Sequence, residues 1–333
     1  MVPAGRRGTH PSGHESDLMI FMNRRRQPVR YHRPVYEDPP PFRSLALEVS
    51  QGHRLQVQLS GKPAGIPALV LHGGPGSGCS PLLRRFFDPA RYCIVCVDQR
   101  GAGRSTPRGA TAHNTTADLL DDLRALRELL GIGRWLVVGG SWGATLALAY
   151  ALREPAAVLG LLLRATFLAR ASDIEAFFAR PDGQPPLRWQ EIDRATSSEA
   201  GAIALAWWRH EQSMSGSPAP APAPPAGAAL EALVDRYRVQ SHYLRHRCWL
   251  DEPPLLDRCA ALPRVPTLLL HGSADRVCPP AGAAALHARV PHAGLRWVEG
   301  AGHDPAHPAM AAAMVEALDR FACAGSLEQE AHA

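Results

Sequence analysis

RWLVVGGSWGATLALAYALRE, residues 134–154, is the stretch that decides the fold. Its first third is an apolar run that ends in two glycines, which is typical of a buried β-strand entering a tight turn. The remainder is rich in alanine and leucine and stops before Pro155, which favours a buried helix that ends there. G-x-S-x-G lies between the two, with Ser141 at its centre. A serine on a strand–turn–helix is the arrangement of a nucleophile elbow.

Strand and helix patterns alternate on both sides of this stretch. Strands are predicted at 68–72, 92–98, 159–165, 264–272 and 295–300, and helices at 115–130, 281–289 and 309–322. Two runs of alternating polarity, SLALEVS and LQVQLSG, flank QGHR and predict a β-hairpin before the first of these strands. Strands that alternate with helices indicate an α/β fold with a mostly parallel sheet, whose functional residues gather at the carboxyl ends of the strands.

The alternation is interrupted between residues 166 and 255. This segment holds four of the seven tryptophans and predicts helices, and it contains the low-complexity loop SGSPAPAPAPPAGA. We therefore expect a helical cap inserted into the core and lying over the strand ends. The expected organisation is a disordered arm (1–43), a first part of the core (44–165), the cap (166–255) with its Pro/Ala-rich loop (215–228), a second part of the core (256–323) and a tail (324–333).

Positive charge is concentrated at the amino terminus. Residues 1–43 carry eight arginines and four acidic residues, a net +4 out of +5 for the whole chain. The rest of the chain is nearly neutral, which argues against a nucleic-acid-binding face on the folded body. Residues 135–152 are 18 uncharged residues, the lower limit for a membrane span, but GGSWG lies within them and a strand, turn and helix explain them better. We expect neither a nucleic acid nor a membrane as partner.

The seven cysteines are scattered along the chain. Cys93 and Cys96 form a CxxC, but they lie inside the strand-like run YCIVCVD. Positions i and i+3 of a strand face opposite sides, which argues against a redox or zinc pair and favours buried thiols. This pattern indicates a reducing compartment, and we expect a cytoplasmic protein.

A serine nucleophile needs a general base, and the base needs a carboxylate that orients it. In this fold the three residues follow in the order serine, acid, histidine. HGSADRVCPP places Asp275 directly after one predicted strand, and GAGHDPAHP places His303 directly after the next. We therefore predict a catalytic triad of Ser141, Asp275 and His303. Asp304 and His307 lie nearby, at positions that favour helix capping or surface roles.

HGGPGSGCS, residues 72–80, follows an apolar run and has the composition of an anion-binding loop. A phosphate-binding P-loop would require a lysine where this chain has Cys79, which argues against a nucleotide. In a serine hydrolase such a loop supplies one N–H of the oxyanion hole, and the residue after the nucleophile supplies the other. We assign these donors to Gly74, with Gly73 as the close alternative, and to Trp142.

Six segments together resemble the proline iminopeptidases (prolyl aminopeptidases) of the α/β-hydrolase fold. They are HGGPGSG, FFDPARYCIVCVDQRGAGRSTP, NTTADLLDDLRALRELLGI, GGSWGATLALAYALREP, HGSADRVCPP and GAGH, collinear within about residues 44–320. The resemblance implies a serine exopeptidase that releases N-terminal proline, or a similar small residue, through an acyl-enzyme. It places the triad on the same three residues and requires no metal or organic cofactor. The implied substrates are small peptides and amino-acid amides or esters.

The resemblance is weaker in the cap, where these enzymes hold the substrate's α-ammonium group with acidic side chains. WWRHE, ending at Glu211, resembles a W-x-x-W-E segment and makes this residue the amine anchor; a solvated helix glutamate is the alternative. VQSHYL resembles I-E-N-H-Y-F, with Gln240 in place of the second acid. A hydrogen bond to a charged group contributes about 1.5–3 kcal/mol and a neutral one about 1 kcal/mol, so this change weakens amine binding or alters the substrate.

A second class of serine hydrolase has the same predicted catalytic residues. A serine esterase, lactonase or amidase would keep the same core with a repurposed cap. The complete Ser-His-Asp set argues against an inactive binding protein, and the serine at position 141 argues against epoxide hydrolases and haloalkane dehalogenases, which use an aspartate nucleophile. His242 and His246 are four residues apart, but no third ligand is evident for zinc.

Overall fold

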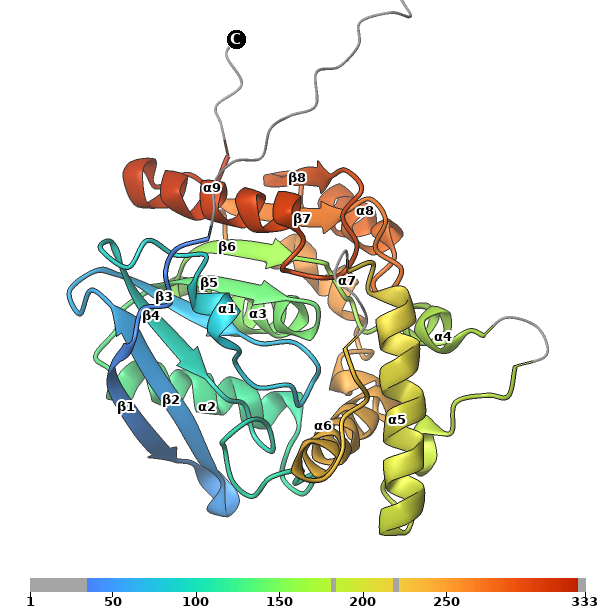
Figure 1. Ribbon diagram of the computed structural model, residues 1–333. Helices are drawn as coiled ribbons and strands as arrows, with labels where there is room; N and C mark the ends of the chain where they lie inside the picture. Colours follow the sequence, from blue (N-terminus) through green and yellow to red (C-terminus); the bar gives the residue numbers. More distant parts are fainter. Residues whose placement is uncertain (1–34, 181–183, 218–221, 329–333) are drawn as a thin grey trace, which may run out of the picture. The chain divides into compact units, whose positions relative to one another are not determined.

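The computed structural model describes residues 35–180, 184–217 and 222–328. An eight-stranded sheet in the order β1-β2-β4-β3-β5-β6-β7-β8 forms the centre of this part of the chain (Figure 1). Strand β2 runs antiparallel to β1 and β4, and all pairs from β4 to β8 are parallel, which confirms the predicted hairpin and mostly parallel sheet. The strands are β1 (Pro41–Glu48), β2 (Arg54–Gly61), β3 (Ile66–Leu71), β4 (Tyr92–Val97), β5 (Trp135–Gly140), β6 (Val158–Arg164), β7 (Thr267–Gly272) and β8 (Ala293–Val298).

Helices cover the sheet on both sides; in Figure 1, α2 and α3 lie behind it and α9 lies in front. The core helices are α1 (Pro81–Arg84), α2 (Thr116–Leu129), α3 (Trp142–Arg153), α8 (Pro280–Arg289) and α9 (Pro308–Ala324). Strands β4, β5 and β7 are buried almost throughout, as expected for parallel strands with helices on both faces. None of the helices in the described residues is long and apolar enough to cross a membrane.

The cap is inserted between β6 and β7. Its helices are α4 (Ala171–Phe178), α5 (Ser197–Met214) and α6 (Ala228–Arg245), and α7 (Leu255–Arg258) leads back to the core. The cap has an apolar cluster of its own, in which Phe178 stacks on Trp189 and Trp207 stacks on Tyr237. The Pro/Ala-rich loop connects α5 to α6, and its residues 218–221 lie outside the described residues.

The folded core begins before residue 44, so residues 35–43 do not belong to a disordered arm. Strand β1 begins at Pro41, and the backbone N–H of Tyr36 donates to the carbonyl of Arg85. Asp38 forms an ion pair with Arg84. Residues 1–34 of the expected arm, and 329–333 of the expected tail, lie outside the described residues.

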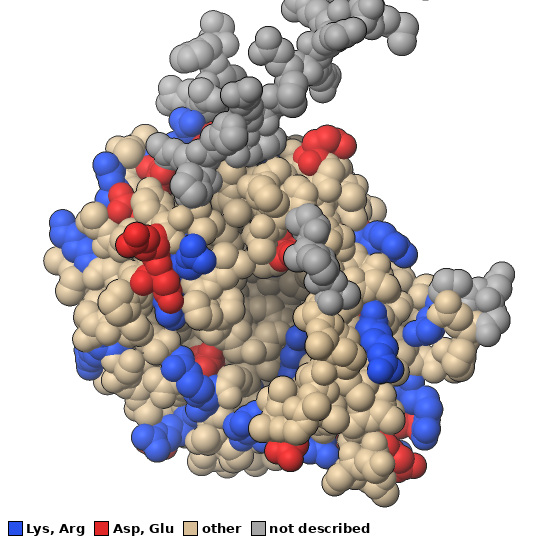
Figure 2. Space-filling view, in the orientation of Figure 1, with Lys and Arg blue, Asp and Glu red and all other residues tan. Residues whose placement is uncertain are grey.

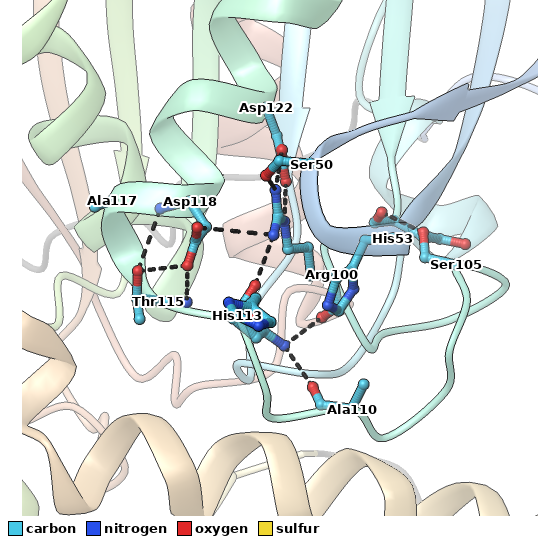
Figure 3. A network of polar contacts seen from close by, with 12 residues as sticks. Ser50, His53, Arg100, Ser105, Ala110, His113, Thr115, Ala117, Asp118 and Asp122 are labelled. Carbon is cyan, nitrogen blue, oxygen red and sulfur yellow. Dashed lines mark hydrogen bonds and ion pairs between the residues drawn. The ribbon is translucent and has the colours of Figure 1, made fainter.

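A buried arginine anchors the turn that follows β4. The guanidinium of Arg100 donates two hydrogen bonds, each 2.7 Å long, to the carboxylate of Asp122 on α2. It also donates to the carbonyl of His113 and to the hydroxyl of Ser50, so that one side chain joins four segments (Figure 3). Because the side chains of Arg100 and Asp122 are both buried, removing Arg100 would leave the charge of Asp122 uncompensated, at a cost of about 3–5 kcal/mol.

The same turn supports the cap through Asn114. The side-chain amide of Asn114 donates to the carbonyls of Arg100 and Ala110. Its side-chain oxygen accepts a hydrogen bond of 2.8 Å from the hydroxyl of Tyr243 on α6. The ring of Tyr243 packs edge-on against Trp142 at the start of α3. The cap helix α6 is thereby held against the turn after β4 and against the elbow.

The elbow between β5 and α3 depends on glycine because the backbone segments touch. A Cβ atom on Gly143 would lie 2.1 Å from the carbonyl oxygen of Leu71, and one on Gly139 would lie 2.2 Å from the carbonyl oxygen of Gly143. Ser141, between them, has φ 57° and ψ −125°, a conformation that a non-glycine residue adopts only when its surroundings enforce it.

Replacing Gly143 with alanine should lower the free energy of unfolding by about 3 kcal/mol, because the added methyl group requires a backbone shift. Gly133→Ala is the matched control, since its added Cβ would meet nothing within 4 Å. That control should change stability by no more than about 1 kcal/mol. Urea unfolding followed by circular dichroism measures both, and equal midpoints would contradict the close approach at the elbow.

Candidate active site

The structure brings the ends of three strands together at one edge of the sheet. Ser141 follows β5, Asp275 follows β7 and His303 follows β8. The N–H of Ser141 donates to the carbonyl of Arg164 at the end of β6, which ties the elbow to the neighbouring strand. All three residues of the predicted triad thus lie at the carboxyl ends of parallel strands, the edge at which the sequence pattern places them.

Asp275 and His303 form a hydrogen-bonded pair. Nδ1 of His303 lies 2.9 Å from Oδ2 of Asp275. The other carboxylate oxygen accepts hydrogen bonds of 2.9 Å from the backbone N–H groups of Val277 and Cys278. Burial alone would raise the pKa of Asp275, but the positive charge of His303, its hydrogen bond and the N–H of Cys278 together lower it. The carboxylate is therefore ionised, Nδ1 of His303 carries a proton, and Nε2 is left to act as a base.

A second histidine, which the sequence analysis missed, lies behind this pair. His271 is the penultimate residue of β7 and is fully buried. Its Nδ1 accepts a hydrogen bond from the N–H of Thr166, so its proton must be on Nε2, which faces the carbonyl of Cys278 at 2.8 Å. Burial lowers the pKa of His271 and keeps the ring neutral. It holds the loop that carries Asp275.

Ser141 and His303 line one cavity of about 600 Å³ between the core and the cap. Figure 2 shows this hollow near the middle of the face. The nearest hydrogen-bonding contact described for the Ser141 hydroxyl is the Cys278 thiol, at 3.9 Å. The apolar part of the wall comes from both core and cap, and it consists of Phe167, Ile174, Phe177, Leu244 and Val277.

The glycine-rich loop forms another part of the cavity wall and touches the cap helix α6, since a Cβ on Gly76 would lie 2.6 Å from the carbonyl oxygen of Arg236. Gly73 and Gly74 both line the cavity, and a Cβ on Gly73 would lie 3.5 Å from that of Ser141. Trp142 is the first residue of α3, so its N–H has no acceptor within the helix. Cys79 is turned away from the cavity entrance: its N–H donates to Asp98 and its thiol faces the carbonyl of Val97.

The two candidate amine-binding residues line the same cavity, but they differ in how well they are paired. The carboxylate of Glu211 accepts hydrogen bonds of 2.9 Å from the guanidinium of Arg236 and from the hydroxyl of Tyr237. Gln240 is buried, and its side-chain oxygen has no hydrogen-bond partner among the described residues. Arg236 neutralises Glu211, a pairing that no sequence pattern predicts because the two residues lie on different helices.

The cap also holds the loop of His303. The carbonyl of Ser215, at the end of α5, accepts hydrogen bonds from the N–H groups of His303 and Asp304, at 2.7 and 3.3 Å. A Cβ on Gly302 would lie 2.5 Å from this carbonyl, so the loop and the cap are in direct contact. Asp304 also lines the cavity, and His307 precedes the first turn of α9.

His242 and His246 contact backbone carbonyls, those of Asn114 and of His242 itself. Over residues 35–180, 184–217 and 222–328, no group of three histidine, cysteine or acidic side chains is placed to bind a metal ion.

Similarity to known proteins gives the structural class of this chain. Residues 67–204 match the family model described as alpha/beta hydrolase fold, and residues 251–333 match the one described as TAP-like protein. The esterase EaEST from Exiguobacterium antarcticum has a similar fold, with a TM-score of 0.61 and 20% identity over 85% of this chain and all of that one. The chain is an α/β hydrolase.

Two relatives of similar length place the chain in one family within this class. A probable proline iminopeptidase from Leptolyngbya boryana is 37% identical over 312 residues, covering 87% of this chain and 97% of the relative. A proline iminopeptidase from Xylella fastidiosa is 38% identical over 311 residues, covering 87% and 99%. The chain belongs to the proline iminopeptidase family, as the sequence motifs indicated.

Asp275 should make stability depend on acid pH. Its folded-state pKa is lower than the ordinary value of 3.8, so its ionisation contributes stability above about pH 4 that is lost as the pH falls through the folded-state pKa. Replacing it with asparagine should therefore reduce the slope of unfolding free energy against pH below pH 4, by up to about 1.4 kcal/mol per unit. Urea titrations between pH 2 and 5 measure this slope, with the exposed Asp257→Asn as control. Equal slopes for wild type and Asp275→Asn would contradict the expectation.

Proposed function

We propose that the protein is a serine exopeptidase that releases N-terminal proline, or a similar small residue, from peptides and from amino-acid amides or esters. The observation that carries the proposal is the hydrogen-bonded Asp275–His303 pair together with a serine held in a strained turn, with Ser141 and His303 lining the same cavity. The membership of the proline iminopeptidase family supports the choice of substrate.

In the acylation step, the hydroxyl oxygen of Ser141 attacks the carbonyl carbon of the substrate's first residue while its proton passes to Nε2 of His303. Asp275 keeps the imidazole in the required tautomer and stabilises the imidazolium. The N–H groups of Gly74 and Trp142 donate to the oxyanion, and each such donor is typically worth about 10²–10³ in rate. The C–N bond then breaks, and His303 returns the proton to the departing amine.

Deacylation repeats these steps with water as the nucleophile. His303 removes a proton from the water, whose oxygen attacks the ester carbonyl. The bond between that carbonyl and the Ser141 oxygen breaks, the serine recovers its proton from His303, and the free amino acid leaves. The reaction needs no metal or organic cofactor, because every charge that develops has a protein partner.

We assign the recognition of a free substrate N-terminus to the cap side of the cavity. Glu211 would receive the substrate's ammonium group, and the unpaired oxygen of Gln240 would accept a second hydrogen bond from it. Phe167, Phe177 and Leu244 provide an apolar wall for a pyrrolidine ring. Because Arg236 already pairs with Glu211, this subsite has little net charge and should bind an ammonium group more weakly than a site with two free carboxylates.

The same pairing favours a second candidate, a serine esterase, lactonase or amidase that does not require the ammonium group. The two candidates differ in their response to N-acetylation. The exopeptidase should hydrolyse proline esters only when the amine is free, whereas the esterase should hydrolyse the acetylated forms as well.

Proline should be released from proline naphthylamide by the wild type, and Ser141→Ala should reduce kcat by a factor of about 10⁴ or more, because it removes the nucleophile. A fluorophosphonate probe should label the wild type but not the variant. A wild type without activity on any prolyl substrate with a free N-terminus would overturn the proposal.

Gln240→Glu should raise kcat/KM for proline naphthylamide by about tenfold, because it converts a neutral hydrogen bond to the ammonium group into a charged one. It should not raise kcat/KM for the N-acetylated proline ester. Gln212→Glu is the matched control, since this residue lines the same cavity from α5. An equal gain in both variants would show that general acidity of the cavity, rather than the position of Gln240, is responsible.

A further inference from the structure

A buried glutamine lies between the two segments assigned to the oxyanion hole. Gln99, in the turn after β4, is 3% exposed. Its backbone N–H and its side-chain amide both donate to His72, to Nε2 at 3.0 Å and to the carbonyl oxygen at 3.1 Å. Its side-chain oxygen accepts a hydrogen bond of 2.8 Å from the indole N–H of Trp142. The side chain therefore contacts both the residue before Gly73 and the residue after Ser141.

These contacts determine where His72 carries its proton. A backbone amide only donates, so Nε2 of His72 must be the acceptor in its bond with Gln99. The proton of the neutral ring is then on Nδ1, which donates to the carbonyl of Gly73 at 2.8 Å. Burial lowers the pKa of His72, and the positive charge of Arg236 lowers it further. The negative charge of Asp98 raises the pKa, but burial is the larger effect, so the ring stays neutral.

The orientation of one peptide unit follows from this bond. The peptide between Gly73 and Gly74 is planar and trans, so its carbonyl and its N–H point in opposite directions. With the carbonyl held by His72, the N–H of Gly74 points away from His72. Gly74 and Ser141 line the same cavity, which is consistent with this N–H reaching the place where an oxyanion would form. This geometry favours Gly74 over Gly73 as the donor.

The second donor is tied to the same glutamine. The indole of Trp142 is fully buried between Gln99 and the ring of Tyr243, 5.0 Å away. Trp142 is the first residue of α3, and its buried side chain anchors the start of this helix, where its backbone N–H lies. The two segments also touch directly, because a Cβ on Gly143 would lie 3.0 Å from the carbonyl oxygen of His72.

We propose that Gln99 is a positioning residue for the oxyanion hole: by holding His72 and Trp142 at once, it sets the distance and angle between the N–H donors of Gly74 and Trp142. The inference rests on the proposed function, because an oxyanion arises only in acyl transfer. Gln99 thereby connects three of the motifs in this chain, DQRGAGRS, HGGPG and GGSWG. Donors of this kind act only when held within about 0.5 Å of the productive geometry.

Gln99→Leu tests the role, because leucine has a similar volume but makes neither side-chain hydrogen bond. We expect kcat for proline naphthylamide to fall about 10–100-fold while KM changes less than about twofold, since the oxyanion exists only in the transition state. Gln56→Leu is the matched control: its side chain donates only to the carbonyl of Val57, on the hairpin strand β2. The control should leave kcat within about twofold of the wild type.

An inhibitor separates positioning from a general loss of structure. The boronic acid analogue of proline forms a tetrahedral adduct with a serine nucleophile, and its oxygen occupies the place of the oxyanion. Its Ki should increase in Gln99→Leu by the same factor by which kcat falls, whereas the KM for proline naphthylamide should change less than about twofold. If Gln99→Leu does not fold, Gln99→Glu serves in the same measurements, because it keeps the shape and an acceptor for Trp142 and replaces the donor to His72 with a carboxylate oxygen that faces the same carbonyl.

Trp142→Phe supplies a second test, since it removes the indole N–H that donates to Gln99, together with part of the ring, and keeps an aromatic side chain at the start of α3. If Gln99 acts through Trp142, the losses of kcat in Gln99→Leu and Trp142→Phe should be smaller in combination than the product of the two. Unchanged kcat and boronate Ki in Gln99→Leu would overturn the proposal, as would a rise in KM at constant kcat. A failure of the proposed function would appear instead in the wild type, as an absence of proline release.

Discussion

The contact between the backbones of β3 and α3 is the constraint on which the rest of the site depends. Gly143 lies so close to the carbonyl of Leu71 that no side chain fits between them. Because the helix begins this close to the sheet, the chain must turn within one residue, and Ser141 takes the strained conformation of that turn. The hydroxyl is thereby presented at the strand ends, and the glycine-rich loop that follows β3 is brought beside it.

The turn after β4 distributes support to the surrounding segments through three consecutive side chains. Asp98 accepts hydrogen bonds from the backbone of Cys79 and Arg104, which holds the end of the glycine-rich loop. Gln99 joins that loop to the elbow, and Arg100 is buried against Asp122. The three side chains contact different parts of the fold. One short segment therefore holds the glycine-rich loop and the elbow at Ser141 and, through Asn114, contacts the cap. Changes in this turn would therefore affect chemistry and stability together.

The sequence predicted the features that depend on local pattern. The elbow, the parallel sheet and the strands that precede Asp275 and His303 all follow from apolar runs and glycine positions within short windows. The support of the site by Gln99 and His271, and the pairing of Glu211 with Arg236, depend on residues that meet only after packing, so no spacing in the sequence reveals them. The start of the core was also missed, because its prolines suggested disorder; β1 is an edge strand, where a proline such as Pro41 is tolerated since one side of the strand has no neighbour.

The bond between the cap and the His303 loop has a consequence for how such enzymes diverge. The cap contributes the carbonyl oxygen of Ser215, a main-chain atom that almost any residue at this position would supply. Side chains of α5 that face the cavity, such as Gln212, can therefore change without releasing the loop that carries His303. The lining of the cap side can thus vary while the position of the His303 loop is kept, so long as residue 302 stays a glycine and lets the two backbones meet.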